Sequence, residues 1–435
     1  MKSIFLSLIV LVICSPLIFT EIQQAHGAYS KATPEEGGPT FKDPSLKAIK
    51  IVEGLDHPTS MAFIGPDDIL VLQKNDGTVH RIVNGKVIEK PLLQVEVSQG
   101  VEWGMLGIAV SKNNNAQPNN PTHVFLYYTQ PSGNVAPDSA DSENGESSDV
   151  NSIYRYDLVG EALVNPKLLI NLPANMPSGG QENNHVGGKL EIGPDNNLYA
   201  TIGDVGGRNG QAQNIADGDP LDGTSGILRM TKDGLAVPSS PNSTPPPQNK
   251  QSEIKDFYYA YGIRNSFGLD FDPISKKLWD TENGGTANDE INLVDKGFNS
   301  GWVKVQGLAG QGFNAQSELV QFPNSFYRDP DFVWEGTIGV TFLQFLQSSK
   351  LGQQYANTMF VGDVNTGNLY NFQLNKDRNG LVLQGGLVDK VANTDDDQTP
   401  IIFGSGFGVI TDIKEGPDGF LYILNYSGEI YKIYK

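Results

Sequence analysis

The stretch TDIKEGPDGFLYILNYSGEIYKIY, residues 411–434, has the pattern that decides the fold of this chain. A segment of alternating apolar residues leads into a Pro-Asp-Gly turn, a second apolar segment follows, and a Ser-Gly turn leads into a third. Alternation with a period of two between turn-forming residues predicts β-strands joined by tight turns. This stretch therefore predicts one three-stranded unit.

The same order of strands and turns recurs along the chain. The units start near residues 61, 106, 190, 269, 342 and 411. Their spacing is roughly 70 residues when polar insertions are included, and repeated small sheets that bury one face on their neighbours are typical of a closed ring. The sequence therefore predicts an all-β fold, a six-bladed β-propeller of four-stranded blades over residues 46–435, with a β-sandwich as the alternative.

The composition excludes other classes of protein. The chain has 435 residues with 49 Gly, 26 Pro and 19% charged residues, which argues against a helical bundle, and its 38% of hydrophobic residues is enough for a packed core. The 31 basic and 50 acidic residues give a net charge of −19, which repels phosphate backbones. We therefore expect no nucleic-acid partner.

The N-terminal residues are typical of an export signal. Lys2 precedes the apolar run 4–19, and small residues stand before a cleavage site after Gly27. The apolar run is short for a membrane span of about 20 residues. We therefore expect a signal peptide over 1–27, a secreted or periplasmic protein, and no stable membrane insertion after cleavage. An uncleaved membrane anchor is the alternative.

Polar stretches separate the expected signal peptide and strands. Residues 28–45 are predicted to be a polar tether, and 113–121, 132–150 and 237–251 are predicted to be surface loops. Cys14, the only cysteine, lies inside the expected signal peptide. A cleaved chain would therefore contain neither disulfides nor cysteine chemistry.

Two segments ahead of expected innermost strands contain polar groups suited to chemistry. His185 lies among glycines and amides, and a histidine can act as a general base near neutral pH. Arg264 and Asn265 precede the strand near 269, where a guanidinium is suited to a carboxylate or a developing oxyanion. A histidine that bonds loop carbonyls and an arginine that closes a turn are the structural alternatives.

The loop DTENGGTANDEINLVDKGFNSGW, residues 280–302, combines two kinds of oxygen ligand. Asp289 and Glu290 contribute carboxylates, and Gly284 and Gly285 allow backbone carbonyls to turn toward one point. Calcium takes about six to eight oxygen ligands of these kinds. The spacing differs from that of an EF-hand, and from the residues alone, solvated acids explain the loop equally well.

These segments resemble the soluble quinoprotein glucose/sorbosone dehydrogenase family, also called aldose sugar dehydrogenases. The resemblance is carried by NHVGGKLEIGPDNNLYATIGDVGGRN (184–209), YGIRNSFGLDFDP (261–273) and ENGGTANDEINLVDKGFNSGW (282–302), with weaker support at 102–110 and 332–345. Such proteins are six-bladed propellers that use pyrroloquinoline quinone (PQQ) and calcium.

The resemblance implies a role for each matching residue. His185 corresponds to the base that takes the proton from the C1 hydroxyl of the sugar while hydride passes to the quinone. Arg264 and Asn265 correspond to residues beside the quinone oxygens, where Arg264 stabilises developing charge. The carbonyls of Gly284 and Gly285 correspond to ligands of the calcium that polarises the cofactor.

Three further positions have roles only through the resemblance. Asp289 and Glu290 match acids that are associated with additional structural calcium. Trp334 lies where an aromatic residue can cover the ring system of the cofactor, and a place in the hydrophobic core is the alternative.

Four positions differ from the family pattern. Asn365 stands near an expected Lys, and Val409 and Thr411 stand near two expected Arg that bind carboxylates of the cofactor. Each lost charge-assisted bond is worth roughly 1.5–3 kcal/mol. Glu102 stands where a neutral Gln in contact with the cofactor site is typical.

We therefore expect an exported PQQ- and calcium-dependent sugar dehydrogenase. It would oxidise the C1 hydroxyl of an aldose with His185 as general base and pass electrons to an acceptor that the sequence does not identify. Because the three cations are absent, two alternatives stay open: a calcium-dependent propeller lactonase or hydrolase, and a non-enzymatic binding propeller that has lost the cofactor.

Overall fold

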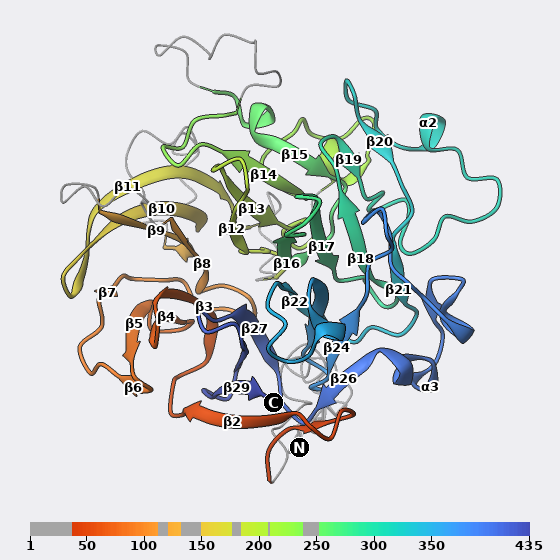
Figure 1. Ribbon diagram of the computed structural model, residues 1–435. Helices are drawn as coiled ribbons and strands as arrows, with labels where there is room; N and C mark the ends of the chain where they lie inside the picture. Colours follow the sequence, from red (N-terminus) through yellow and green to blue (C-terminus); the bar gives the residue numbers. More distant parts are fainter. Residues whose placement is uncertain (1–36, 112–120, 132–148, 176–183, 208, 238–251) are drawn as a thin grey trace, which may run out of the picture.

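The computed structural model describes residues 37–111, 121–131, 149–175, 184–207, 209–237 and 252–435. Within these residues the strands form six sheets arranged around a centre (Figure 1). The described α-helices are single turns, α2 (Ala315–Glu318) and α3 (Asp395–Gln398). The prediction of an all-β propeller is therefore confirmed.

The first three sheets, each given from its innermost strand outward, follow one another along the chain. The first consists of β3 (Pro58–Gly65), β4 (Asp68–Gln73), β5 (Thr78–Val83) and β6 (Lys86–Val87), with β7 (Leu93–Gln94) also paired to β5. The second consists of β8 (Met105–Ser111), β9 (Thr122–Gln130), β10 (Val150–Val159) and β11 (Ala162–Pro173). The third consists of β12 (Leu190–Ile192), β13 (Leu198–Ile202), β14 (Gly226–Met230), β15 (Tyr258–Tyr261), β19 (Phe298–Asn299) and β20 (Phe326–Tyr327).

The other three sheets combine neighbouring strands with strands that are distant in sequence. The fourth consists of β16 (Ser266–Phe271), β17 (Leu278–Glu282), β18 (Asp289–Val294), β21 (Phe332–Trp334) and β25 (Val391–Ala392). The fifth consists of β22 (Val340–Leu346), β23 (Thr358–Asp363), β24 (Leu369–Phe372), β26 (Ile402–Ser405) and β1 (Thr40–Phe41). The sixth consists of β27 (Ile410–Glu415), β28 (Leu421–Asn425), β29 (Ile430–Tyr434) and β2 (Lys47–Val52).

The innermost strands of the six sheets form a closed ring. Contacts join β3 to β8, β8 to β12, β12 to β16, β16 to β22, β22 to β27, and β27 back to β3. Each unit start expected from the sequence lies in one of these strands, because alternation and turn residues are local signals. The ring brings the starts of six distant segments to one axis.

Two details of the prediction need correction. Four-stranded blades are wrong as a general rule, because only two of the described sheets have four strands and the others have five or six. The second half of the expected tether, from residue 37 on, is not free, since β1 pairs with β26 and Phe41 packs edge-on against Phe403 and Phe407. The expected signal peptide and most of the three expected loops lie outside the described residues.

Apolar side chains fill the spaces between neighbouring sheets. Between the sixth and first sheets, Met61, Ile69 and Val71 pack with Tyr422 and Leu424. The N-terminal strand β2 pairs antiparallel with β29, so the two ends of the described chain complete one sheet and close the ring. Closure leaves few exposed sheet edges.

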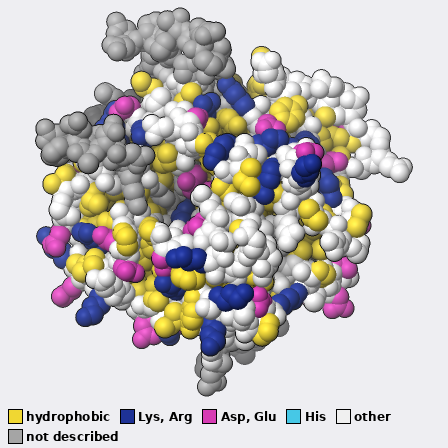
Figure 2. Space-filling view, viewed as in Figure 1, with side chains coloured by type: hydrophobic (Ala, Val, Ile, Leu, Met, Phe, Trp, Pro, Cys, Tyr) yellow, Lys and Arg dark blue, Asp and Glu magenta, His cyan; other side chains and the backbone are white. Residues whose placement is uncertain are grey.

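The surface of this ring is mixed in charge. On the face drawn in Figure 2, acidic and basic side chains are interspersed, so the net negative charge does not form a single patch there. No helix in the described part of the chain is long and apolar enough to cross a bilayer.

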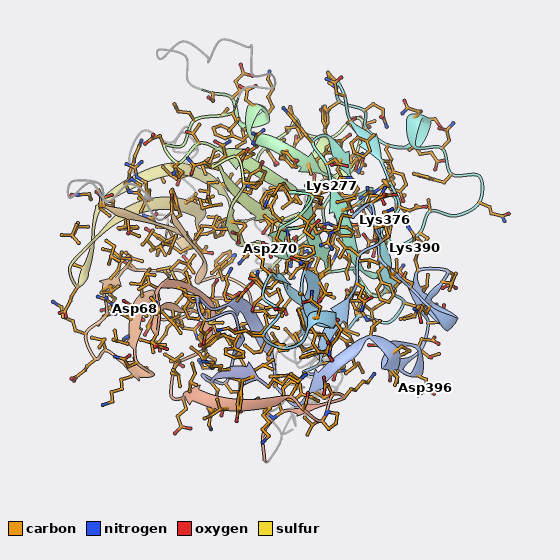
Figure 3. All side chains as sticks on the ribbon, in the orientation of Figure 1. Asp68, Asp270, Lys277, Lys376, Lys390 and Asp396 are labelled. Atoms are coloured by element: carbon orange, nitrogen blue, oxygen red, sulfur yellow. The ribbon has the colours of Figure 1, made fainter. Side chains whose placement is uncertain are left out.

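Buried carboxylates connect neighbouring innermost strands. Asp412 Oδ2 on β27 accepts hydrogen bonds from Ser60 Oγ (2.9 Å) and Met61 N (2.7 Å) on β3. Asp270 Oδ2 on β16 accepts one from Phe345 N (2.7 Å) on β22. Asp270 lies near the centre of the ring, whereas Asp396 lies at the periphery (Figure 3). These bonds satisfy strand edges that no further strand covers.

We expect Asp412→Ala to lower the free energy of unfolding by about 1–3 kcal/mol, because it leaves the buried Met61 N–H without its acceptor. Denaturant unfolding measures the change. Asp396→Ala, at an exposed position, is the control and should change it by less than about 0.5 kcal/mol. Equal losses in both variants would contradict the role assigned to Asp412.

We also expect Asp270 to make stability depend on pH. Burial, reinforced by the nearby Glu191 carboxylate, raises the pKa of Asp270 to about 7, whereas an unfolded Asp titrates near about 3.9. Its contribution to stability is therefore complete below about pH 4 and is lost as the pH rises to about 7. Asp270→Asn should reduce the fall in unfolding free energy between about pH 5 and pH 8; an unchanged fall would contradict this.

Candidate functional site

A cavity of about 600 Å³ lies on the axis of the ring, and we call it the funnel cavity. Every innermost strand, or the residue just before it, contributes to its lining: Ser60, Leu106, Lys189, Phe267, Phe342 and Thr411. A volume of this size is typical of a small-molecule site. The sequence-predicted residues His185, Arg264, Asn265, Gly284 and Gly285 line the same cavity.

His185 is held between an acid and a guanidinium. Its Nδ1 lies 2.6 Å from Asp204 Oδ1, and its Nε2 lies 2.7 Å from Arg264 Nη2. A guanidinium can only donate, so Nε2 is the acceptor and the ring proton lies on Nδ1, directed at Asp204. The imidazole is therefore neutral, with its lone pair on the nitrogen that faces Arg264.

Asp204 was not anticipated from the sequence, although it lies in the quoted segment 184–209 that contains His185. Its side chain is buried, and its second oxygen, Oδ2, accepts a hydrogen bond from Trp302 Nε1 (2.8 Å). The Trp302 ring also lies 5.5 Å from the Arg264 guanidinium. The available sequence signal for Asp204 was an acid placed two residues after a buried strand. Trp302 had no sequence signal, because its contacts depend on the fold.

The backbone around His185 is crowded and strained. His185 has a φ of 56°, in the left-handed region that non-glycine residues rarely adopt. A Cβ at Gly203 would lie 2.2 Å from the His185 carbonyl oxygen and 2.6 Å from that of Arg264. Asp204 N also donates to the Arg264 carbonyl (2.8 Å). The missing side chain at Gly203 therefore lets these two segments approach each other.

Asn265 is fixed by Glu102 and by the segment after His185. Its Nδ2 donates to Glu102 (3.2 Å to each oxygen), and its Oδ1 accepts from Gly187 N (3.1 Å). Glu102 Oε2 also accepts from Val186 N (3.1 Å). Burial raises the pKa of Glu102, while these hydrogen bonds and the nearby Arg264 guanidinium act in the opposite direction. Glu102 thus lies at the cavity as expected and orients the Asn265 amide.

The glycine turn is held directly beside Arg264. Arg264 Nη1 donates to the carbonyl oxygens of Asn283 (3.1 Å) and Gly284 (2.6 Å). Its backbone N–H donates to Glu282 Oε1 (2.7 Å), and burial raises the pKa of Glu282 to about 7. Carbonyl oxygens of this turn therefore face the Arg264 guanidinium.

Asp289 and Glu290 lie beneath the turn. Asp289 Oδ1 accepts from Gly284 N (2.9 Å), and Oδ2 accepts from Ile338 N (2.8 Å) and Gly339 N (2.7 Å), so both oxygens are occupied by backbone amides. Glu290 accepts from Gly307 N, and burial together with Glu282 raises its pKa well above the usual value. The described residues include no group of three or more His, Cys, Asp or Glu side chains arranged for a metal.

Trp334 does not cover the cavity. It is fully buried in the hydrophobic cluster between the fourth and fifth sheets, edge-on to Phe332, Tyr370 and Phe372. The core alternative is therefore the placement that the structure shows, because β21 directs this residue between sheets.

The positions where the resemblance implies cations are uncharged. Asn365 lines the funnel cavity and donates through Nδ2 to the Thr337 carbonyl (3.2 Å), and Thr411 lines it nearby. Val409 is buried. Two lysines that sequence reasoning missed, Lys74 and Lys189, line the cavity instead.

Sequence comparison identifies the family of this chain. A family model described as Glucose / Sorbosone dehydrogenase matches residues 55–432. The chain is 27% identical over 386 residues to the aldose sugar dehydrogenase YliI of Escherichia coli (strain K12), spanning 87% of this chain and 90% of that protein. It is 30% identical over 297 residues to quinoprotein glucose dehydrogenase B of Acinetobacter calcoaceticus, spanning 64% and 57%.

Solved structures show the same architecture. The PQQ-bound form of an aldose sugar dehydrogenase from Streptomyces coelicolor superimposes with a TM-score of 0.60 at 22% identity, over 91% of this chain and 99% of that chain. The apo form of the soluble aldose sugar dehydrogenase from Escherichia coli gives a TM-score of 0.64 at 21% identity, over 89% and 99%. At these identities the likeness shows a shared fold.

We expect Gly203→Ala to disrupt the site, because its Cβ would collide with the carbonyl oxygens of His185 and Arg264. A clash of this kind costs about 1–3 kcal/mol of stability, measured by denaturant unfolding. Gly310→Ala is the matched control, since a Cβ there meets nothing within 4 Å. Unfolding free energies that are equal in the two variants would show that the close approach at Gly203 is not required.

Proposed function

Because the chain belongs to the glucose/sorbosone dehydrogenase family, we propose that it oxidises the C1 hydroxyl of an aldose with PQQ as cofactor and calcium as metal. The observation that carries this proposal is the His185 imidazole at the funnel cavity. Asp204 accepts the hydrogen bond from Nδ1–H, so the Nε2 lone pair, which Arg264 now occupies, can accept the proton of a substrate hydroxyl that displaces the guanidinium.

The residues of the funnel cavity fit a planar anionic cofactor. Arg264 and Asn265 stand on one side, and the turn at Gly284 and Gly285 provides carbonyl oxygens of the kind that calcium binds. The buried ammonium of Lys189 has no hydrogen-bond partner, as expected of a cation that awaits an anion. These residues would hold PQQ and its calcium.

When bound, PQQ supplies the acceptor for the hydride from C1, and calcium polarises that acceptor. The chain's own contribution begins at His185, whose Nε2 takes the hydroxyl proton as the carbonyl of the product forms. Asp204, bonded to Nδ1, stabilises the imidazolium that results. The buried acid therefore keeps the base in the required tautomer.

Arg264 must move for this step. Its Nη2 occupies the His185 lone pair, so a substrate hydroxyl has to displace it. The backbone of Arg264 is fixed by the Glu282 carboxylate, so only the guanidinium needs to turn. A guanidinium released beside the site can then stabilise developing negative charge.

The uncharged positions support a second candidate, a non-enzymatic binding propeller. Asn365, Val409 and Thr411 provide no positive charge for the carboxylates of PQQ. A calcium-dependent lactonase, in which the metal activates water and His185 is the base, uses the same cavity without the cofactor. We also propose that the protein is exported through the expected signal peptide, residues 1–27, and that its substrate is an aldose.

Reconstitution separates these candidates. The apoprotein is mixed with PQQ and calcium, and the quinone absorbance is followed as aldoses are added. We expect a bound quinone spectrum that aldose bleaches, because hydride transfer reduces the ring. Hydrolysis of a lactone with calcium alone would support the lactonase instead, and sugar binding without either reaction would support the binding propeller.

His185→Ala should lower turnover of the reconstituted enzyme by about 10²–10⁴-fold, the usual contribution of a positioned base. His123→Ala is the matched control: its Nδ1 pairs with Asp157 at 2.8 Å, but it lies on β9, outside the residues that line the funnel cavity. Calcium and PQQ binding should persist in both variants. Unchanged turnover in His185→Ala would exclude this residue as the base.

A further inference from the structure

Lys189 is a buried cation without a hydrogen-bond acceptor. It directly precedes β12, and only 4% of its surface is exposed. Its Nζ donates a hydrogen bond to no acceptor among the described residues, and its charged neighbours are the Lys414 ammonium, which repels it, and the Asp412 and Glu191 carboxylates, which act in the opposite direction. Burying an ammonium that has no hydrogen-bond acceptor costs free energy of folding. Its presence therefore indicates a role other than packing.

The side chain of Lys189 reaches from the third sheet to the fifth. Its Nζ lies 3.5 Å from the centre of the Phe342 ring, on β22, although Lys189 itself belongs to the third sheet. Phe342 lines the funnel cavity together with Asn365 and Thr411. The ammonium therefore lies against a residue that lines the cavity together with two of the positions where the expected cations are missing.

The other cations of the cavity are already committed. Lys74 Nζ donates to the Gly100 carbonyl (2.7 Å), and burial lowers its pKa to about 8. Arg264 bonds His185 and two carbonyls of the glycine turn. Among the lining residues that the structure describes, Lys189 is thus the cation that remains available to an anion.

A neighbouring lysine, Lys414, contacts the same aromatic ring but is paired with a carboxylate. Lys414 Nζ lies 4.5 Å from the centre of the same Phe342 ring, but it faces Glu191 at 3.7 Å. Lys414 also lines a second cavity of about 530 Å³, to which Glu191 and Gln344 contribute. Phe342 therefore contacts one paired and one unpaired lysine.

We propose that Lys189 binds a carboxylate of the cofactor and replaces the cations that are absent at Asn365, Val409 and Thr411. This inference rests on the proposed function, since it assumes that a planar polycarboxylate such as PQQ occupies the funnel cavity. The ammonium enters from the third sheet, so the charge is supplied without a cation on β27 or after β23.

The surroundings of Lys189 make the protonation of its amine sensitive to a bound anion. Burial and the nearby Lys414 lower the pKa of Lys189 to about 7, while Asp412 on β27 and Glu191 on β12 act in the opposite direction. Asp270 on β16 adds negative charge near Lys414. A carboxylate at Nζ would raise the pKa of Lys189, so binding near neutral pH should take up a proton.

The test measures binding to the apoprotein, so it does not depend on turnover. Fluorescence titration gives the affinity of the calcium-loaded protein for PQQ and for its uncharged trimethyl ester. Lys189→Met should weaken PQQ binding at least about tenfold and leave ester binding unchanged, because only the charged ligand loses a bond. Lys189→Arg should retain most of the affinity. Calorimetry in buffers of different ionisation enthalpy should show proton uptake in the wild type that Lys189→Met abolishes.

Thermal unfolding of the same apoproteins separates binding from structure. Lys189→Met should raise the melting temperature, because it removes an unpaired buried charge. Lys414→Met is the matched control: it should lower the melting temperature, since Glu191 loses its partner, and change PQQ affinity less than about threefold.

Three results would overturn the proposal. PQQ affinity that is unchanged in Lys189→Met, with a lower melting temperature, would make Lys189 structural. Equal losses in Lys189→Met and Lys414→Met would show a general effect of charge at the axis. A wild type that binds no PQQ would remove the proposed function together with this inference, whereas the first two results leave the proposed function intact.

Discussion

The innermost strand of each sheet has one edge that no strand can cover, and the ring depends on how that edge is satisfied. Backbone N–H and C=O groups buried near the axis need partners. Side chains of an adjacent sheet supply them at four of the six junctions between the described sheets, and five bonds show how. The bonds are Thr59 Oγ1 to Met105 O, Thr201 Oγ1 to Ser266 O, Thr281 Oγ1 to Thr341 O, Phe345 N to Asp270 and Met61 N to Asp412.

This arrangement places charge where a propeller would otherwise be apolar. Asp412 is fully buried and Asp270 is half-buried because strand edges need acceptors, and a carboxylate removed from water requires compensation nearby. Lys189 and Lys414 lie close to these two carboxylates. Lys414 is paired with Glu191, whereas the Lys189 ammonium donates no hydrogen bond. The positive charge available to a ligand at the axis thus arises from the same constraint that closes the ring.

The sequence predicts the parts of this structure that depend on local pattern. The innermost strands follow from alternation and Pro-Asp turns, and His185, Arg264, Asn265 and the glycine turn meet because each precedes or follows such a strand. The remaining features depend on contacts between distant segments. Local sequence does not predict three such features: the pairing of β1 with β26, the burial of Trp334 and the contact of Lys189 with Phe342 in the fifth sheet.

The candidate base is positioned by backbone crowding as much as by its side-chain partners. Gly203 directly follows β13 in the third sheet, and any Cβ at this position would collide with the carbonyl oxygens of both His185 and Arg264. The next residue, Asp204, accepts a hydrogen bond from His185 Nδ1–H, and its backbone N–H donates to the Arg264 carbonyl. Two consecutive residues therefore hold the base and the guanidinium in one geometry, and the positive φ of His185 is a strain that these bonds maintain. Because the backbone of Arg264 is fixed in this way, exchange of its guanidinium for a substrate hydroxyl at Nε2 can occur by rotation of one side chain while the strands around it stay in place.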